Sequence, residues 1–221
     1  MDSRHIYRHF CMGARTLEVV GERWSLLIVR DLLLGPQRFT DLLRGLNEIS
    51  PTRLTDRLRR LEAEGLVARE PLSSGREVWY RLTDSGRDLG PVVEALILWG
   101  IEHRLDPPRP GEPVCPVPLM IGTKVWLSRN ATKVAHPLSW VWHFAPDDVY
   151  TIRFDEDQWV LARGDSPTAA VTITSSLETW ARFLTTRRTE RRLPDADIQL
   201  AGKSPAIKEF ARLFGTKLRS G

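Results

Sequence analysis

Hydrophobic residues in the first third of the chain recur at helical spacing. Apolar positions from 17 to 34 repeat at three- and four-residue intervals and predict one long helix. Gly35-Pro36 ends this helix, because proline cannot continue it. A short helix at residues 39–43 follows, and residues 45–49 lead into a third helix that starts at Ser50. Two helices joined by a tight turn are typical of a helix-turn-helix unit.

The segment from Ser50 to Leu61 combines an apolar face with a basic one. Ser50 suits the N-cap position and Pro51 the first helical turn. Leu54 and Leu58, with Leu61, lie on one face and predict its burial. The opposite face carries polar side chains: Thr52, Arg53, Asp56, Arg59 and Arg60. Since arginine and threonine contact phosphates and base edges, we expect this helix to recognise DNA; a solvated surface helix is the alternative.

Two strand-like runs follow, at residues 66–70 and 77–82, around the polar turn at 72–76. They predict a β-hairpin. A hairpin directly after a recognition helix is a wing, whose Arg76 would lie along phosphates; an ordinary hairpin with solvated arginines is the alternative. The complete predicted DNA-binding set is Arg38, Thr40, Ser50, Thr52, Arg53, Thr55, Asp56, Arg57, Arg59, Arg60 and Arg76.

Several motifs occur in order along this half of the chain: Cys11-Met12-Gly13-Ala14-Arg15-Thr16-Leu17, Gly21-Glu22-Arg23-Trp24-Ser25-Leu26-Leu27, Arg38-Phe39, Ile49-Ser50-Pro51 and Leu58-Arg59-Arg60-Leu61-Glu62. Over residues 8–104 the chain resembles the HxlR-type bacterial regulators. The resemblance implies a winged helix-turn-helix domain that acts as a homodimer at operator DNA and represses or activates a nearby gene.

The segment from Leu89 to Leu105 predicts a dimerisation helix. Leu89, Val93 and Leu96 form one apolar stripe. Further apolar residues widen this surface beyond the face that one small domain covers: Ile97, Leu98, Ile101 and Leu105. We expect a helix of a second copy to cover it, and the alternative is cover by a second domain of the same chain.

The length of 221 residues predicts two domains. Six prolines in residues 105–118 indicate a linker, which we place at 106–118, between a DNA-binding and dimerisation domain at 1–105 and a second domain at 119–221. The predicted fold class is α+β. The second domain shows five strand-like runs and two helices: strands at 138–144, 149–154, 158–163, 169–174 and 198–201, and helices at 176–184 and 204–214.

This order predicts a curved antiparallel sheet covered by helices. From Phe144 to Phe214 the chain resembles the sterol carrier protein fold, through Val171-Thr172-Ile173-Thr174, Glu178-Thr179-Trp180 and Ile198-Gln199-Leu200-Ala201-Gly202-Lys203. It departs from that pattern at residues 119–139 and at the basic run 187–192, which contacts an anion or DNA or is a solvated loop. The resemblance implies a pocket for an apolar or amphipathic small molecule between sheet and helices.

Aromatic residues are the candidate lining of that pocket. Trp140, Trp142 and Phe144 alternate, so on a strand they share one face, where they line a pocket or fill a core. The complete predicted ligand-binding set is Trp126, Trp140, Trp142, Phe144, Trp159, Trp180 and Phe183.

Charge and composition narrow the function further. The chain has 32 basic and 28 acidic residues, a formal net charge of +4, so local clustering and not net charge supports DNA binding. Two distant cysteines cannot form a disulfide framework. No secretory signal or membrane-length apolar run occurs, so we expect a cytoplasmic protein without a membrane partner. Catalytic and cofactor motifs are absent from the sequence, which favours a non-enzyme without cofactor. His5 and His9, four residues apart with Cys11 close behind, form a partial metal site if that segment is helical, but they lack a fourth ligand, so we expect no metal.

These patterns predict a dimeric regulator of transcription that a small hydrophobic ligand modulates. One alternative is a thiol-based redox regulator with a scaffolding second domain, because some HxlR-type relatives sense oxidants through a cysteine that matches Cys11; a small apolar filler is the simpler interpretation of that residue. The other alternative is a lipid-type carrier with vestigial DNA binding.

Overall fold

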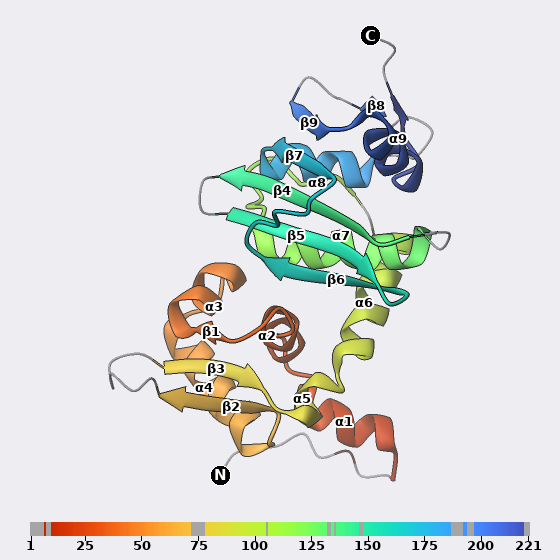
Figure 1. The fold of residues 1–221 in the computed structure, drawn as a ribbon. Coiled ribbons are helices and arrows are strands. Elements are labelled where there is room, and N and C mark those ends of the chain that lie inside the picture. Colours follow the sequence, from red (N-terminus) through yellow and green to blue (C-terminus); the bar gives the residue numbers. More distant parts are fainter. Residues whose placement is uncertain are drawn as a thin grey trace. The chain divides into compact units, whose positions relative to one another are not determined.

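The computed structural model describes residues 7, 10–71, 78–104, 106–131, 134, 136–145, 148–186, 192–193 and 197–218. The chain divides into two compact units, residues 1–95 and 96–221 (Figure 1). The division falls inside helix α6 (Gly90–His103), ahead of the linker that the prolines predict. Within the described residues, no helix combines the length and apolarity needed to cross a bilayer.

The first unit consists of short helices and a small sheet. Its helices are α1 (Met12–Val20), α2 (Ser25–Leu32), α3 (Phe39–Leu46), α4 (Pro51–Ala63), α5 (Asp84–Arg87) and the start of α6. Its strands are β1 (Gln37–Arg38), β2 (Val67–Pro71) and β3 (Val78–Leu82), in the order β1-β3-β2. Both pairings are antiparallel, with Val67 opposite Leu82 and Gln37 opposite Tyr80. The order and pairing correspond to the predicted helix-turn-helix followed by a wing.

The single long helix predicted for residues 17–34 is wrong, because the structure has two helices there. Helix α1 ends where the Gly21 N–H donates to the Leu17 carbonyl at 2.8 Å. A Cβ added to Gly21 would lie 2.4 Å from that carbonyl oxygen, so the chain passes closer here than a side chain allows. Apolar spacing continues through the break, which is why periodicity alone joined the two helices.

The second unit is built on a five-stranded sheet. Its strands are β4 (Leu138–Ala145), β5 (Asp148–Asp155), β6 (Gln158–Arg163), β7 (Val171–Ser175) and β9 (Ile198–Gly202), in the order β6-β5-β4-β7-β9. The short strands β8 (Arg192–Leu193) and β10 (Lys217–Leu218) pair separately. The helices are the end of α6, α7 (Pro116–Asn130), α8 (Leu177–Thr185) and α9 (Ser204–Leu213).

The sheet is mixed, so the prediction of an antiparallel sheet was wrong. Strand β4 pairs with β5 in antiparallel register but with β7 in parallel, with Trp140 opposite Val171. The chain leaves β6 at one edge and crosses β5 and β4 through residues 164–170 before β7 begins. A crossover makes the two flanking strands parallel, and side-chain alternation carries no information about strand direction.

Helix α7 was missed, and it takes in the last residues of the predicted linker. It starts at Pro116 and extends through the stretch that departed from the sterol carrier pattern. Pro116 and Pro118 occupy its first turn, where proline's missing N–H breaks no helical hydrogen bond. A proline-rich segment therefore served here as a helix start.

Aromatic side chains fill the core of the second unit. Trp140, Trp142 and Trp180 are fully buried, together with Phe210 and Phe214. Ring centroids of Trp140 and Phe210 lie 4.9 Å apart, and those of Phe210 and Phe214 lie 4.7 Å apart. Of the two interpretations of the aromatic stripe, the structure therefore favours the core for Trp140 and Trp142, and Trp180 of α8 lies in the same core.

Candidate nucleic-acid interface

Local sequence fixes the start of helix α4. The Ser50 side chain accepts a hydrogen bond from the Arg53 N–H at 3.3 Å, and Pro51 occupies the first turn. Asn47, in the turn after α3, has a φ of 53°, a left-handed conformation that asparagine tolerates better than most residues. Leu54, Leu58 and Leu61 are buried, as predicted. The N-cap and the leucine stripe thus determine which face of α4 reaches the surface.

The exposed face of α4 presents four polar side chains: Thr52, Arg53, Asp56 and Arg59. Two of them are cations whose guanidinium groups lie at the surface, and the N-terminal half of the helix carries three of the four. A face of this kind suits base edges and phosphates. Their contact with DNA stays a prediction.

Two further predicted contacts, Arg57 and Arg60, lie on the inner side of α4. Their guanidinium groups form ion pairs with the Glu22 carboxylate, each at 3.2 Å. Arg60 also donates to the Glu18 carbonyl at 3.1 Å. These contacts fasten α4 to the segment between α1 and α2, and contact of Arg57 and Arg60 with DNA stays a prediction. The spacing of the arginines along α4 could not reveal a partner that lies 35 or more residues upstream in sequence.

The remaining predicted residues occupy different environments. Arg38 and Thr40 are exposed at the start of α3, and the Arg38 guanidinium lies 5.0 Å above the Trp79 ring. The Thr55 hydroxyl donates to the Pro51 carbonyl at 2.9 Å, and Ser50 serves as the N-cap, so both are used within the helix. Arg76 lies outside the described residues.

A buried carboxylate joins α2 to α3, and the sequence reasoning missed it. Asp31 is 1% exposed and forms an ion pair with Arg30 at 2.7 Å. A Cβ added to Gly45 in α3 would lie 3.0 Å from the Asp31 carboxylate, so glycine permits this close approach. A lone acidic residue within an apolar helical run was the available signal, because an unpaired charge is not tolerated there.

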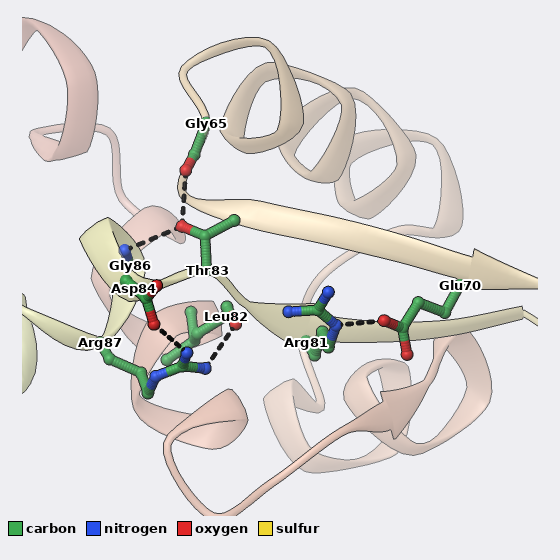
Figure 2. Close-up of polar contacts among 8 residues, drawn as sticks. All are labelled: Gly65, Glu70, Arg81, Leu82, Thr83, Asp84, Gly86 and Arg87. Carbon is green, nitrogen blue, oxygen red and sulfur yellow. Dashed lines mark hydrogen bonds and ion pairs between the residues drawn. The ribbon is translucent and has the colours of Figure 1, made fainter.

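A polar cluster fixes the root of the wing, as Figure 2 shows. The Thr83 hydroxyl donates to the Gly65 carbonyl at 2.6 Å, just past α4, and accepts from the Gly86 N–H at 3.1 Å in α5. A Cβ on Gly86 would lie 2.1 Å from the Leu66 carbonyl oxygen, so the two segments touch through backbone. One side chain thus ties together the end of α4, the wing and α5.

Ion pairs complete the wing root. Arg81 pairs with Glu70 across the hairpin, and Arg87 pairs with Asp84 (Figure 2). Arg87 also donates to the Leu82 carbonyl at 2.8 Å. These arginines have protein partners, so they set the position of the hairpin.

Among the described residues, helices α6 and α1 expose large apolar side chains. Helix α6 exposes Val92, Leu96 and Trp99, at 42%, 53% and 54%. Their spacing of four and three residues places them on one face. The predicted stripe is shifted, because Val93 is 4% exposed and Trp99 was not included. At the N-terminal side, Met12 and Leu17 of α1 are also exposed.

The other predicted site residues are a thiol and the aromatic set. Cys11 is exposed at the N-cap of α1, where its sulfur accepts from the Ala14 N–H at 3.4 Å. Trp159 and Phe183 are buried and Phe144 is half-buried. Trp126 is 4% exposed and also lines an apolar pocket.

Comparison with known proteins agrees with the winged-helix architecture. Residues 19–106 match the family described as HxlR-like helix-turn-helix. An uncharacterized HTH-type transcriptional regulator of Mycobacterium tuberculosis (strain ATCC 25618 / H37Rv) is 48% identical over 113 residues, which cover 51% of this chain and 68% of the relative. The uncharacterized HTH-type transcriptional regulator YvaP of Bacillus subtilis (strain 168) is 35% identical over 94 residues, covering 42% of this chain and 86% of YvaP.

Among solved structures, the redox regulator HypR in its oxidized form is 36% identical and covers 42% of this chain and 98% of its own, with a TM-score of 0.41. Residues 19–106, which match the family model, contain α4 with its capped start and the root of the wing. This chain therefore belongs to the HxlR-like helix-turn-helix family of transcriptional regulators.

Proposed function

We propose that the protein is a homodimeric transcriptional regulator that places α4 in the major groove of an operator and responds to a small apolar ligand. The observation that carries the DNA-binding part is the surface of α4. Arg53 and Arg59 lie exposed opposite a fully buried leucine stripe, on a helix whose start is capped by Ser50. A recognition helix needs this combination of fixed backbone and free polar face.

Specificity resides in the N-terminal half of α4, which enters the groove in this arrangement. Thr52 and Asp56 flank Arg53 on the exposed face. Arg59 lies further along the helix and serves as a phosphate contact. Arg38 and Thr40 at the start of α3 supply further backbone contacts.

Arg53→Ala tests this assignment. Loss of a base contact weakens operator binding by about 1–3 kcal/mol, while binding to random DNA falls much less. Affinities are measured by fluorescence anisotropy at several salt concentrations, with Arg182→Ala, an exposed arginine of the second unit, as the charge-matched control. If affinity for operator and for random DNA falls equally, Arg53 contacts phosphates and not bases. If neither affinity falls, α4 does not lie in the groove.

Dimerisation rests on the exposed apolar face of α6. Leu96 and Trp99 expose about half of their surface, at 53% and 54%. Full burial of a large apolar side chain contributes roughly 1.5–3 kcal/mol, so covering these half-exposed side chains contributes about half of that each. A second copy is the proposed cover, because operator binding by a winged-helix regulator uses two half-sites.

Thiol sensing is a second candidate function, which the exposure of Cys11 favours. Oxidant then changes operator affinity in the native protein and has no effect in Cys11→Ser. Cys115, which is half-buried, provides the matched control when it is changed to serine. A response that persists in Cys11→Ser excludes this candidate.

Ligand response is assigned to the second unit. Its aromatic residues and the resemblance to the sterol carrier protein fold support an apolar ligand, although the three fully buried tryptophans belong to the core. Titration of operator binding with a ligand that binds the protein tests the response directly. A ligand that binds without changing operator affinity would make the second unit a scaffold or carrier.

A further inference from the structure

An apolar pocket of about 280 Å³ lies among three helices of the second unit. Its walls come from the C-terminal half of α6, from α7 and from α8, and they include Ile97, Ile101, Leu119 and Leu184. Trp126 forms part of the wall and stacks on Phe214, with ring centroids 5.2 Å apart. The pocket thus borders the aromatic core without being part of it.

Two glycines form part of the helix walls of this pocket. Gly100 lies in α6 and Gly122 in α7, and both line the pocket. A Cβ added at either position would meet no heavy atom within 4 Å. Glycine inside a helix lowers helix stability relative to alanine, and no close approach by a neighbour requires glycine at either position. A large side chain at either position would therefore extend into open space of the pocket wall.

Arg104 is the cationic group of the pocket lining. It follows α6, it is exposed, and its guanidinium donates to the His103 carbonyl at 3.3 Å. The same guanidinium lies 5.5 Å from the centre of the Trp99 ring. The other polar side chain of the lining, Thr185, donates to main-chain carbonyls of its own helix. The lining therefore combines apolar walls with a cation that can meet an anionic group.

We propose that this pocket binds a compact amphipathic carboxylate, with its apolar body between α6, α7 and α8 and its anion on Arg104. The pocket holds an apolar body of roughly nine or ten non-hydrogen atoms, at about 30 Å³ for each water-sized group. A medium-chain fatty acid has this size and charge. The site lies apart from Trp140, Trp142 and Trp180, which the sequence suggested as lining.

The pocket is linked to the proposed dimer surface through one helix and one side chain. Residues Ile97 and Ile101 of α6 face the pocket, whereas Leu96 and Trp99 of the same helix are exposed. The Arg104 guanidinium also contacts the Trp99 ring, so a carboxylate that binds its N–H groups lies beside Trp99, and we expect ligand binding to alter the exposed apolar face. This regulatory step rests on the proposed function, while the binding step does not.

Binding is tested with the full-length protein and sodium decanoate, by isothermal titration calorimetry without DNA. Decanol and decyltrimethylammonium, of equal chain length, test the head group. Decanoate is expected to bind more tightly than either. Equal binding of the cationic probe would overturn the assignment of the anion to Arg104, and absence of decanoate binding would overturn the proposal.

Gly122→Leu fills the pocket and is expected to weaken decanoate binding by at least about tenfold, the effect of excess volume in an apolar site. Ser128→Leu adds the same side chain to an exposed position of α7 outside the pocket and should leave binding unchanged. Gly100→Leu fills the pocket from the opposite helix and replaces Gly122→Leu if that variant does not fold. If a folded variant with either leucine binds decanoate as tightly as the native protein, this pocket is not the binding site.

Arg104→Gln is expected to weaken decanoate binding about three- to fivefold, as for an exposed ion pair, and to leave decanol binding unchanged. Arg109→Gln, an exposed position outside the pocket, is the control. An equal loss for decanol would show that Arg104 supports the fold and not the anion.

Regulation is read separately, as operator affinity with and without saturating decanoate, with an expected change of about fivefold or more. Unchanged operator affinity with retained decanoate binding would overturn the regulatory step alone. If the protein binds no operator under any condition, the proposed function fails, while decanoate binding that depends on Gly122 and Arg104 still stands.

Discussion

Two rows of large apolar side chains have opposite environments in this chain. Along β4, Trp140 and Trp142 are fully buried beneath Phe210 and Phe214 of the α9 region. Along α6, Leu96 and Trp99 are 53% and 54% exposed. Both rows repeat at the spacing of their own secondary structure. Periodicity in the sequence therefore identifies an apolar face that must be buried. Whether another part of the same chain buries it depends on tertiary structure.

The largest expected effect is on the buried row. Trp142→Ala should lower the free energy of unfolding by about 3–5 kcal/mol, because it leaves a cavity in the aromatic core. Trp99→Ala, the matched change on the exposed row, should alter the unfolding of the monomer by less than about 0.5 kcal/mol. Urea denaturation at low protein concentration measures both. If both variants lose similar amounts of unfolding free energy, the two rows do not differ in their contribution to the stability of the monomer.

The next effect concerns assembly. Leu96→Glu places a charge on the exposed face of α6 and should raise the dimer dissociation constant by at least about tenfold, or about 1.4 kcal/mol. Ser128→Glu, which puts a charge on an exposed position of α7, is the control. Analytical ultracentrifugation reads out the change. A dimer that is unaffected by Leu96→Glu would require another surface for dimerisation.

The smallest effect sharpens the account of the buried row. The Trp180 indole N–H donates to the Thr123 hydroxyl at 3.0 Å, and Thr123→Val leaves that buried donor unpaired. We expect a loss of about 1–2 kcal/mol of stability. Ser128→Ala removes a hydroxyl that, like Thr123, donates to a carbonyl four residues upstream in α7, but at an exposed position. Thermal unfolding of both variants would separate the loss of the Trp180 hydrogen bond from the loss of a hydroxyl-to-carbonyl hydrogen bond within α7. Equal losses of stability would contradict a contribution from the Trp180 hydrogen bond.

The sequence predicted those features of the fold that depend on residues close together in the chain. The Ser50 cap, the leucine stripe of α4 and the strand limits of β6 follow from neighbouring residues, and the structure confirms them. The wing strands follow in the same way, with Val67 opposite Leu82.

Contacts between distant residues account for what could not be predicted. Arg57 and Arg60 both pair with Glu22, and no pattern within α4 contains that partner. The parallel pairing of β4 with β7 depends on a crossover. The pocket at Gly100 and Gly122 forms only where two helices come together. In the sequence, each glycine by itself indicates only lower helix stability.

The central position of β4 also determines the order in which this domain can be completed during synthesis. Its first edge is satisfied once β5 has emerged from the ribosome, but its second edge waits for β7, about 30 residues later in the chain, by the register of Trp140 with Val171. At typical synthesis rates of about 5–20 residues per second, this strand edge stays unpaired for seconds, and its tryptophans wait longer still for Phe210 and Phe214. Unpaired strand edges and uncovered apolar side chains favour aggregation, so we expect the second unit to depend on completion of the chain before it folds.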